Sequence, residues 1–236
     1  MKEIFQVFTP ADAVALAFFI LAWTVYHHWI GRGQREHTSL SSQMNAQRML
    51  WMEQMSHREV RIVDTAVMAS LQNGTAFFAS TSLIMLGGAA ALLRSTDDVL
   101  KVFADLPFGL VTARGLWELK IIGLAMIFGY AFFKFSWAYR LFNYTAILMG
   151  ATPAFNHPDK DARDKAARRA AHMNIVAGRH FTRGQRALHF SFAYLGWFVS
   201  PYLLVVTTAA IVYVMVQRQF KSAALRAVLL DGDITN

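Results

Sequence analysis

The chain has 236 residues, of which 55% are hydrophobic, and a mean hydropathy of +0.32, values that exclude an ordinary soluble domain. Because there is no cysteine, disulfides, thiolate metal sites and thiol chemistry are excluded as well. The formal charge of +8 would suggest a nucleic-acid partner for a soluble protein, but here the charges gather between apolar runs. We therefore expect membrane lipid, and no nucleic acid, as the partner.

Four apolar runs predict four membrane-spanning helices, over residues 11–30, 66–93, 116–138 and 190–216. A bilayer core about 30 Å thick needs about 20 apolar residues of helix, and each run is at least that long. Pro201 lies within the fourth run and predicts a bend there. The sequence predicts an all-α fold, namely one integral membrane four-helix bundle over residues 1–236 with amphipathic cytoplasmic helices.

The basic residues predict the orientation of these spans. Fourteen Lys or Arg residues fall in the first and third connections, and seven fall on the opposite side. Since basic residues mark the cytoplasmic face, both termini should lie outside, in the inner (cytoplasmic) membrane of a bacterium. The basic cluster of Arg218, Lys221 and Arg226 after the fourth run opposes this orientation.

Two of the connections are expected to contain helix. In the first, Met44, Trp51, Met55 and Ile62 recur at helical spacing, and without Gly or Pro this helix can run directly into the second span. In the third connection, acidic residues at 159, 161 and 164 precede basic ones, the order that a helix dipole favours.

The third run carries the ionisable residues that interest us most. Glu118 and Lys120 stand near its outer end, Lys134 lies among phenylalanines, and Arg140 and Asn143 follow. Charges inside a bilayer are costly unless they meet water, a partner or the interface. These residues either reach the two interfaces, Lys134 by snorkelling, or face a water-filled interior that attracts an anion.

The second run has a polar and small-residue stripe that includes Ser70, Asn73 and Ser80. Small residues at every fourth position allow helices to approach closely, so packing is the default interpretation. The same hydroxyl and amide groups could also line a solute pathway.

Catalytic and metal-binding signatures are weak. The five histidines near the cytoplasmic side lack the i, i+4 pair and adjacent carboxylate of a helical metal motif; they are His27, His28, His172, His180 and His189. We therefore predict no metal site and no cofactor. No nucleotide loop or nucleophile elbow is present, so an enzyme acting at the headgroup level through these histidines and the arginines is the weakest hypothesis.

Several motifs resemble the membrane family catalogued as domain of unknown function 599. They are LWELK at 116–120, YAFFKFSW at 130–137, Arg140 with FNY at 142–144, RIVD at 61–64, FFAST at 77–81 and HFTRGQRA at 180–187. The resemblance spans most of the chain and implies a four-span membrane protein of bacteria and plants, but it supplies no reaction. Within these motifs, we take Arg61, Asp64, Arg183 and Arg186 as candidates at the cytoplasmic interface.

Two functions are expected from these features. The first is an oligomeric channel or transporter for a small, anionic solute, through Glu118, Lys120, Lys134, Arg140, Asn143 and the second-span stripe. The alternative is a non-transporting scaffold or accessory subunit that binds other membrane subunits through the Met and Trp stripe. Four spans enclose little space, so we expect a homo-oligomer.

Overall fold

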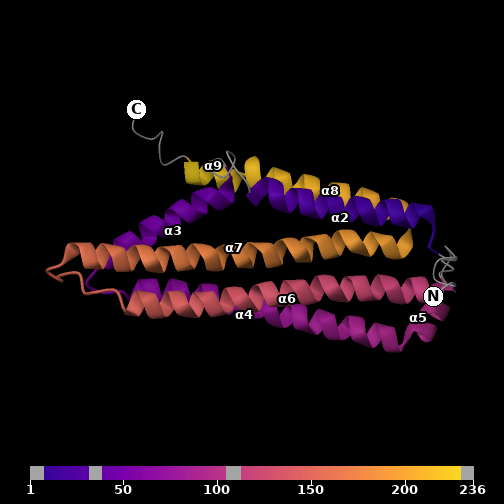
Figure 1. The fold of residues 1–236 in the computed structure, drawn as a ribbon, viewed down its shortest axis with the longest axis horizontal. Coiled ribbons are helices and arrows are strands. Elements are labelled where there is room, and N and C mark those ends of the chain that lie inside the picture. The colour runs from indigo at the N-terminus through magenta and orange to yellow at the C-terminus, as the bar shows by residue number, and fades with distance from the viewer. Residues whose placement is uncertain (1–7, 32–38, 105–112, 230–236) are drawn as a thin grey trace. The chain divides into compact units, whose positions relative to one another are not determined.

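The computed structural model describes residues 8–31, 39–104 and 113–229, which form helices and no strand. The expected all-α class is thus confirmed for the described part of the chain. The helices are α2 (Pro10–Gly31), α3 (Leu40–His57), α4 (Ile62–Arg94), α5 (Thr96–Ala104), α6 (Arg114–Gly150), α7 (Lys160–Val199), α8 (Pro201–Phe220) and α9 (Ala223–Leu229) (Figure 1). Both chain termini, and Arg32 and Arg35 of the first connection, lie outside the described residues.

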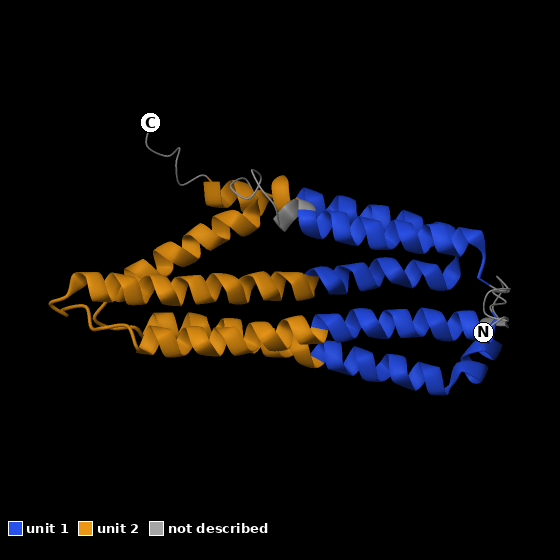
Figure 2. Cartoon of the chain, viewed as in Figure 1, with its two compact units in different colours: residues 1–33, 81–131, 186–217 blue, residues 34–80, 132–185, 218–236 orange. Residues whose placement is uncertain are grey.

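The chain divides into two compact units, which Figure 2 colours separately. Unit 1 comprises residues 1–33, 81–131 and 186–217, and unit 2 comprises residues 34–80, 132–185 and 218–236. Helices α4, α6 and α7 have 33, 37 and 40 residues, and each contributes to both units. At 1.5 Å per residue they are roughly 50 to 60 Å long, nearly twice the thickness of a bilayer core.

Four helices are long and apolar enough to span a membrane: those beginning at Pro10, Ile62, Arg114 and Pro201. The first three correspond to predicted runs. The fourth predicted run, 190–216, is not one bent helix, because α7 ends at Val199 and α8 begins at Pro201.

The chain reverses direction between α7 and α8. Thr207 Oγ1 donates to the Ala193 carbonyl at 2.7 Å, which is out of reach in a continuous helix. Ser200 accepts the Leu203 N–H through its side chain, so Ser200 is an N-cap and Pro201 occupies the first helical position. At Gly196, an added Cβ would lie 2.6 Å from Thr207 Oγ1, so this glycine permits the close crossing.

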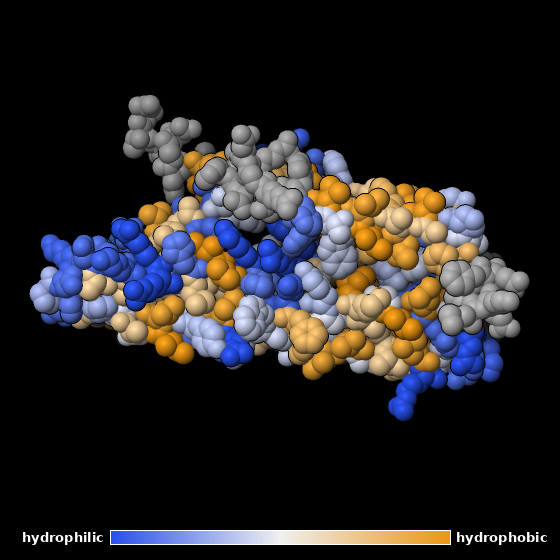
Figure 3. Space-filling view, in the orientation of Figure 1, coloured by the Kyte–Doolittle hydropathy of each residue, from blue (hydrophilic) through white to orange (hydrophobic). Residues whose placement is uncertain are grey.

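Unit 1 is built around the last part of α7. Phe190 stacks on Trp23 of α2 with ring centroids 5.0 Å apart, and Tyr194 lies edge-on to Phe19. Contacts from the start of α2 to the end of α7, and from α7 back along α8, make both pairs antiparallel. Within unit 1, the first residues of α2 and the residues of α8 up to Gln217 therefore lie at opposite ends. Apolar side chains cover much of the visible surface of this unit (Figure 3).

Unit 2 has a methionine-rich core that joins α3, α4, α6 and α7. Its fully buried members include Met52 and Met55 of α3, together with Ala170, Ala171 and Ala177 of α7. The helix expected in the first connection exists, but it ends at His57, and Arg58 adopts an extended conformation before α4 begins. The predicted direct continuation into the second span is therefore wrong, and in the predicted stripe Met44 and Ile62 are exposed while Met55 is buried.

Candidate functional site

A buried polar network lies at one end of unit 1. Asp12, Lys120 and Trp197 are each at most 4% exposed. Trp197 Nε1 donates to Asp12 Oδ1 at 2.7 Å, and Lys120 Nζ donates to the Trp197 carbonyl at 2.7 Å. The lysine also lies 5.4 Å from the Trp197 ring centroid. Three helices, α2, α6 and α7, are thereby held together through one tryptophan.

The sequence explains why each of these groups is there. Asp12 Oδ2 accepts the backbone N–H of Thr9, and Thr9 Oγ1 accepts the N–H of Asp12, which is a capping box at the start of α2. The Trp197 carbonyl would normally accept an N–H from residue 201, but Pro201 has none. Lys120 supplies the missing donor. Its position is therefore fully explained by packing and hydrogen bonding.

Glu118, two residues earlier, occupies the surface instead. Its carboxylate pairs with Arg114 at 2.8 Å, and Arg114 also pairs with Asp97 at 3.0 Å. These side chains are largely exposed, so the pairs contribute little to stability. Lys120 and Glu118 do not line a common path.

The three polar residues named in the predicted stripe of the second run face outward. Ser70, Asn73 and Ser80 of α4 are all exposed. Gly74, on the same helix, has no atom within 4 Å of an added Cβ. Asn143 of α6 accepts a hydrogen bond from Gln72 Nε2 at 2.7 Å.

Asp64 is the centre of a second buried network, in unit 2. It is fully buried, and its Oδ1 accepts from Trp51 Nε1 and from Arg58 Nη1, both at 2.7 Å. Next to it, Arg61 donates to the carbonyls of Thr152 and Pro153 at 2.8 and 2.6 Å. Arg61 and Asp64 were predicted to lie at the cytoplasmic interface. In the structure Asp64 joins α4 to α3, and Arg61 joins the start of α4 to the α6–α7 connection.

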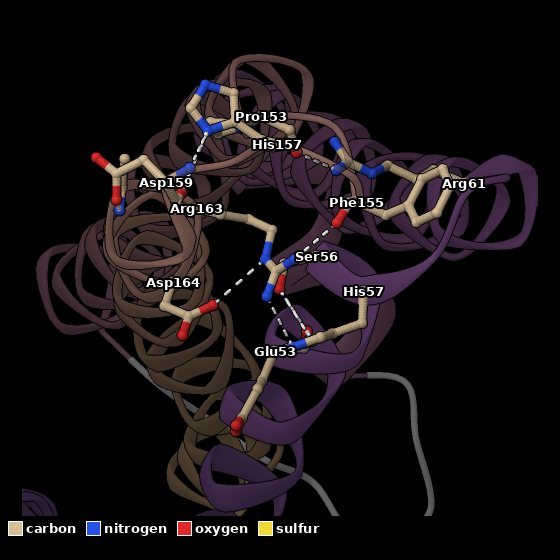
Figure 4. A network of polar contacts seen from close by, with 11 residues as sticks. Glu53, Ser56, His57, Arg61, Pro153, Phe155, His157, Asp159, Arg163 and Asp164 are labelled. Atoms are coloured by element: carbon tan, nitrogen blue, oxygen red, sulfur yellow. Dashed lines mark hydrogen bonds and ion pairs between the residues drawn. The ribbon is translucent and has the colours of Figure 1, made fainter.

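Arg163 completes this attachment from α7 (Figure 4). Its guanidinium donates to the Phe155 carbonyl at 2.7 Å and to His57 Nε2 at 3.1 Å, and it lies 3.5 Å from Asp164. The end of α3, the connection and the start of α7 thus form one rigid corner of unit 2.

A cationic group lies further along α6 and α7, also within unit 2. The ring of His180 lies 6.4 Å from that of Trp137. Burial lowers the pKa of His180, and the charges of Lys134 and Arg183 lower it further. Arg140 extends over Trp137 and Tyr144 on the surface and donates to the Tyr144 hydroxyl.

Arg186 belongs to unit 1, where its guanidinium lies 5.4 Å from the Tyr26 ring. Of the sequence-predicted candidates, the structure therefore brings together Lys134 and Arg183, with Arg140 adjacent. Glu118 and Lys120 belong to unit 1, and Ser70, Asn73 and Ser80 are exposed on α4.

Arg48 of α3 was not among the residues predicted from the sequence. Its Nη1 donates to the backbone and side-chain oxygens of Asn174, at 2.8 and 3.0 Å, and burial lowers its pKa. The guanidinium occupies the space above Gly178, where an added Cβ would collide with it. Asp12 and Trp197 were also missed. The Thr9–Asp12 spacing of a capping box was the available signal for Asp12.

A groove of about 440 Å³ lies between α4 and α6 in unit 2. Its lining combines apolar and polar side chains, namely Arg61, Thr65, Met68, Gln72, Ala146 and Met149, with Gly150. A smaller pocket of about 70 Å³ lies between α3 and α7. Within the described residues, no three His, Asp or Glu side chains are grouped to hold a metal ion.

Comparison with known proteins gives a family but no activity. Neither the curated proteins nor the solved structures include a match to this chain. A family model matches residues 14–224, which includes most of both compact units and all the candidate residues predicted from the sequence. The chain therefore belongs to the family described as "Protein of unknown function, DUF599".

Proposed function

We propose that the chain is a multi-pass protein of the bacterial inner membrane that serves as a non-transporting scaffold or accessory subunit. Four helices meet the length and composition of a membrane span. The last part of α7 adds a fifth crossing. It is less apolar than the others, but Ala187, Phe190 and Ala193 are fully buried by neighbouring helices, so lipid need not solvate it.

Five crossings give a revised orientation. The start of α2 lies outside and the end of α8 lies in the cytoplasm, in place of the expectation of two outer termini. This moves Arg218, Lys221 and Arg226 to the cytoplasmic side, and the charge bias changes from fourteen against seven to seventeen against four. The basic cluster that opposed the four-span orientation now supports the five-span one.

Cysteine labelling tests this orientation, because the natural chain has no cysteine to give background. Glu59→Cys and Ala224→Cys, both at exposed positions, should react with a membrane-impermeant maleimide in inside-out vesicles only. Lys101→Cys should react in right-side-out vesicles only. If Ala224→Cys reacts from the same side as Lys101→Cys, the five-crossing arrangement is wrong.

The rigid corner of unit 2 is the observation that carries the scaffold function. This corner joins α3, α4 and the α6–α7 connection into one piece through Asp64, Arg61 and Arg163. Measured along the helices, it lies further from their opposite ends than the thickness of a bilayer core. Several apolar side chains are exposed on or next to this corner, namely Val60, Ile62, Val63, Val67 and Ile147. A rigid surface with apolar groups outside a bilayer is suited to holding a partner protein.

The size of the native complex tests this function. Extracted in its own lipid, the protein should migrate as a complex heavier than its homo-oligomer, and Ile62→Ser with Val63→Ser should release it to the lighter form. Matched control substitutions at Ser70 and Asn73, also exposed on α4, should leave the complex intact. Isolation of the natural chain only as a homo-oligomer contradicts the scaffold function.

A second candidate, an oligomeric channel or transporter for a small anionic solute, is favoured by the outward-facing stripe of α4. Ser70, Asn73 and Ser80 are exposed on α4, and they would line a lumen if several copies met at this helix. Anion flux in proteoliposomes that falls in Asn73→Leu and Ser80→Leu supports this candidate. Absence of flux from the natural chain removes it.

A further inference from the structure

The acidic residues of this chain are unevenly distributed. Residues 119–158 and 165–230 contain no Asp or Glu, but they contain twelve Lys or Arg. These segments include most of α6 and α7 and all of α8. Within these segments Lys134, His180 and Arg183 are each at least sixteen residues from the nearest Asp or Glu in the sequence, and an anion would complement a cluster of such groups.

Two of these basic side chains, Lys134 and Arg183, converge with His180 in unit 2. Helices α6 and α7 pack closely there, because Gly184 has no side chain and the Phe135 ring fits against it. His180 and Arg183 are three residues apart on α7 and share a face. Lys134 precedes Phe135 on α6, and the charges of Lys134 and Arg183 both act on His180.

His180 has unused hydrogen-bonding capacity. Its Nδ1 atom is buried and has no hydrogen-bond partner among the described residues. A buried ring nitrogen without a partner is costly, and it marks a place where a further group belongs. Trp137, 6.4 Å away between centroids, bounds this side of the cluster.

The depth of the cluster along each helix matches the cytoplasmic headgroup layer of the proposed membrane. On α7, nineteen residues separate His180 from Val199 at the opposite end, which is about 28 Å of helix. On α6, seventeen residues separate Lys134 from Trp117, which is about 26 Å. A bilayer core is about 30 Å thick.

We propose that Lys134, His180 and Arg183 form a binding site for a phosphate group, carried by an anionic phospholipid or present as free phosphate. Arginine binds phosphate oxygens through two parallel N–H groups, lysine adds a mobile point charge, and the imidazole supplies one further donor. The anion offsets the repulsion among the cations. Binding of a phospholipid requires the proposed membrane insertion, whereas binding of free phosphate does not.

Native mass spectrometry of the purified protein in detergent tests the site. In the mass-spectrometry arm, phosphatidylglycerol and phosphatidylcholine are titrated separately. In a second arm, inorganic phosphate is added and the thermal stability of the protein is measured. The natural chain should retain phosphatidylglycerol in preference to phosphatidylcholine. Lys134→Met and Arg183→Gln should each weaken that binding roughly tenfold or more.

Two controls keep the result interpretable. Arg179→Gln removes the same charge from an exposed position of α7, and it should bind like the natural chain. Lys134→Arg keeps the charge and should retain binding even if Lys134→Met fails to fold.

Each outcome decides the proposal. Preference for phosphatidylglycerol that the Lys134 and Arg183 variants lose identifies a lipid site, and stabilisation by inorganic phosphate with the same dependence identifies a free-phosphate site. Equal binding by the Arg179 and Arg183 variants, or no binding of either ligand, overturns the proposal. Cysteine labelling decides membrane orientation independently, so failure here is distinguishable from failure of the membrane assignment.

Discussion

Gly184 is a position where the packing of unit 2 leaves no room for one added methyl group. A Cβ there would lie 2.7 to 2.9 Å from three atoms of the Phe135 ring. That ring is fully buried and is enclosed by Phe78 and Phe181, with centroids 5.4 and 5.6 Å away. Since the ring has nowhere to move, α6 and α7 must separate to accommodate Gly184→Ala.

The loss of folding stability in Gly184→Ala is best judged against Gly74→Ala, because a Cβ added at Gly74 meets nothing within 4 Å. Alanine in place of a helical glycine contributes about 1 kcal/mol of stability at either position, and overpacking at Gly184 costs about 1 to 3 kcal/mol. The gain in helix propensity is the same in both variants, so it cancels when their unfolding free energies are compared. Gly184→Ala should therefore be less stable than Gly74→Ala by about 1 to 3 kcal/mol.

Equilibrium unfolding in mixed detergent micelles, followed by circular dichroism, measures both variants. A second substitution, Phe135→Leu, should recover part of the loss in Gly184→Ala, so that the two changes couple by more than about 0.5 kcal/mol. Equal unfolding free energies for Gly184→Ala and Gly74→Ala would refute the close packing of α6 on α7.

Three further predictions concern buried polar groups. Asp64→Ala should lower the free energy of unfolding by about 3 kcal/mol, since it leaves Trp51 Nε1 without its acceptor, whereas Asp64→Asn should lower it less; chemical unfolding of both variants compares them. Lys120→Met should cost about 1 to 3 kcal/mol by leaving the Trp197 carbonyl without a donor, and an unchanged midpoint would show that another donor replaces it. Because the pKa of His180 is lowered in the folded chain, its contribution to stability should be complete above about pH 6.5 and should decline as the pH falls below that value. His180→Gln should flatten the decline in stability below this pH. If the variant and the natural chain show the same pH dependence, His180 is not the group responsible.

The apolar runs predicted three of the long helices correctly, because length and hydropathy depend only on local sequence. The reversal at Ser200 was missed for a specific reason. A Ser-Pro pair is also the signature of an N-cap followed by the first helical residue, and only the contact of Thr207 with Ala193 distinguishes a new helix from a bend.

The candidate site was predictable in composition but not in arrangement. Lys134 and Arg183 stood out as charges near apolar segments, but their convergence with His180 depends on the register of α6 against α7. That register is set by the contact of Gly184 with Phe135, which are 49 residues apart in the sequence, so no local pattern reveals it. The direction in which Ser70 and Asn73 face could not be deduced, because a small-residue stripe has the same pattern whether it is covered or exposed.

The burial of α7 has a consequence for how the chain would enter the proposed membrane. Phe190, Ala193 and Trp197 face other helices, and the arginines at 183 and 186 oppose partitioning of this segment into lipid by itself. We expect α7 and α8 to insert together as a helical hairpin, after α2 and α6 are in place to receive them. A chain truncated at Ser200 should accordingly leave its last segment outside the lipid phase, where protease would remove it.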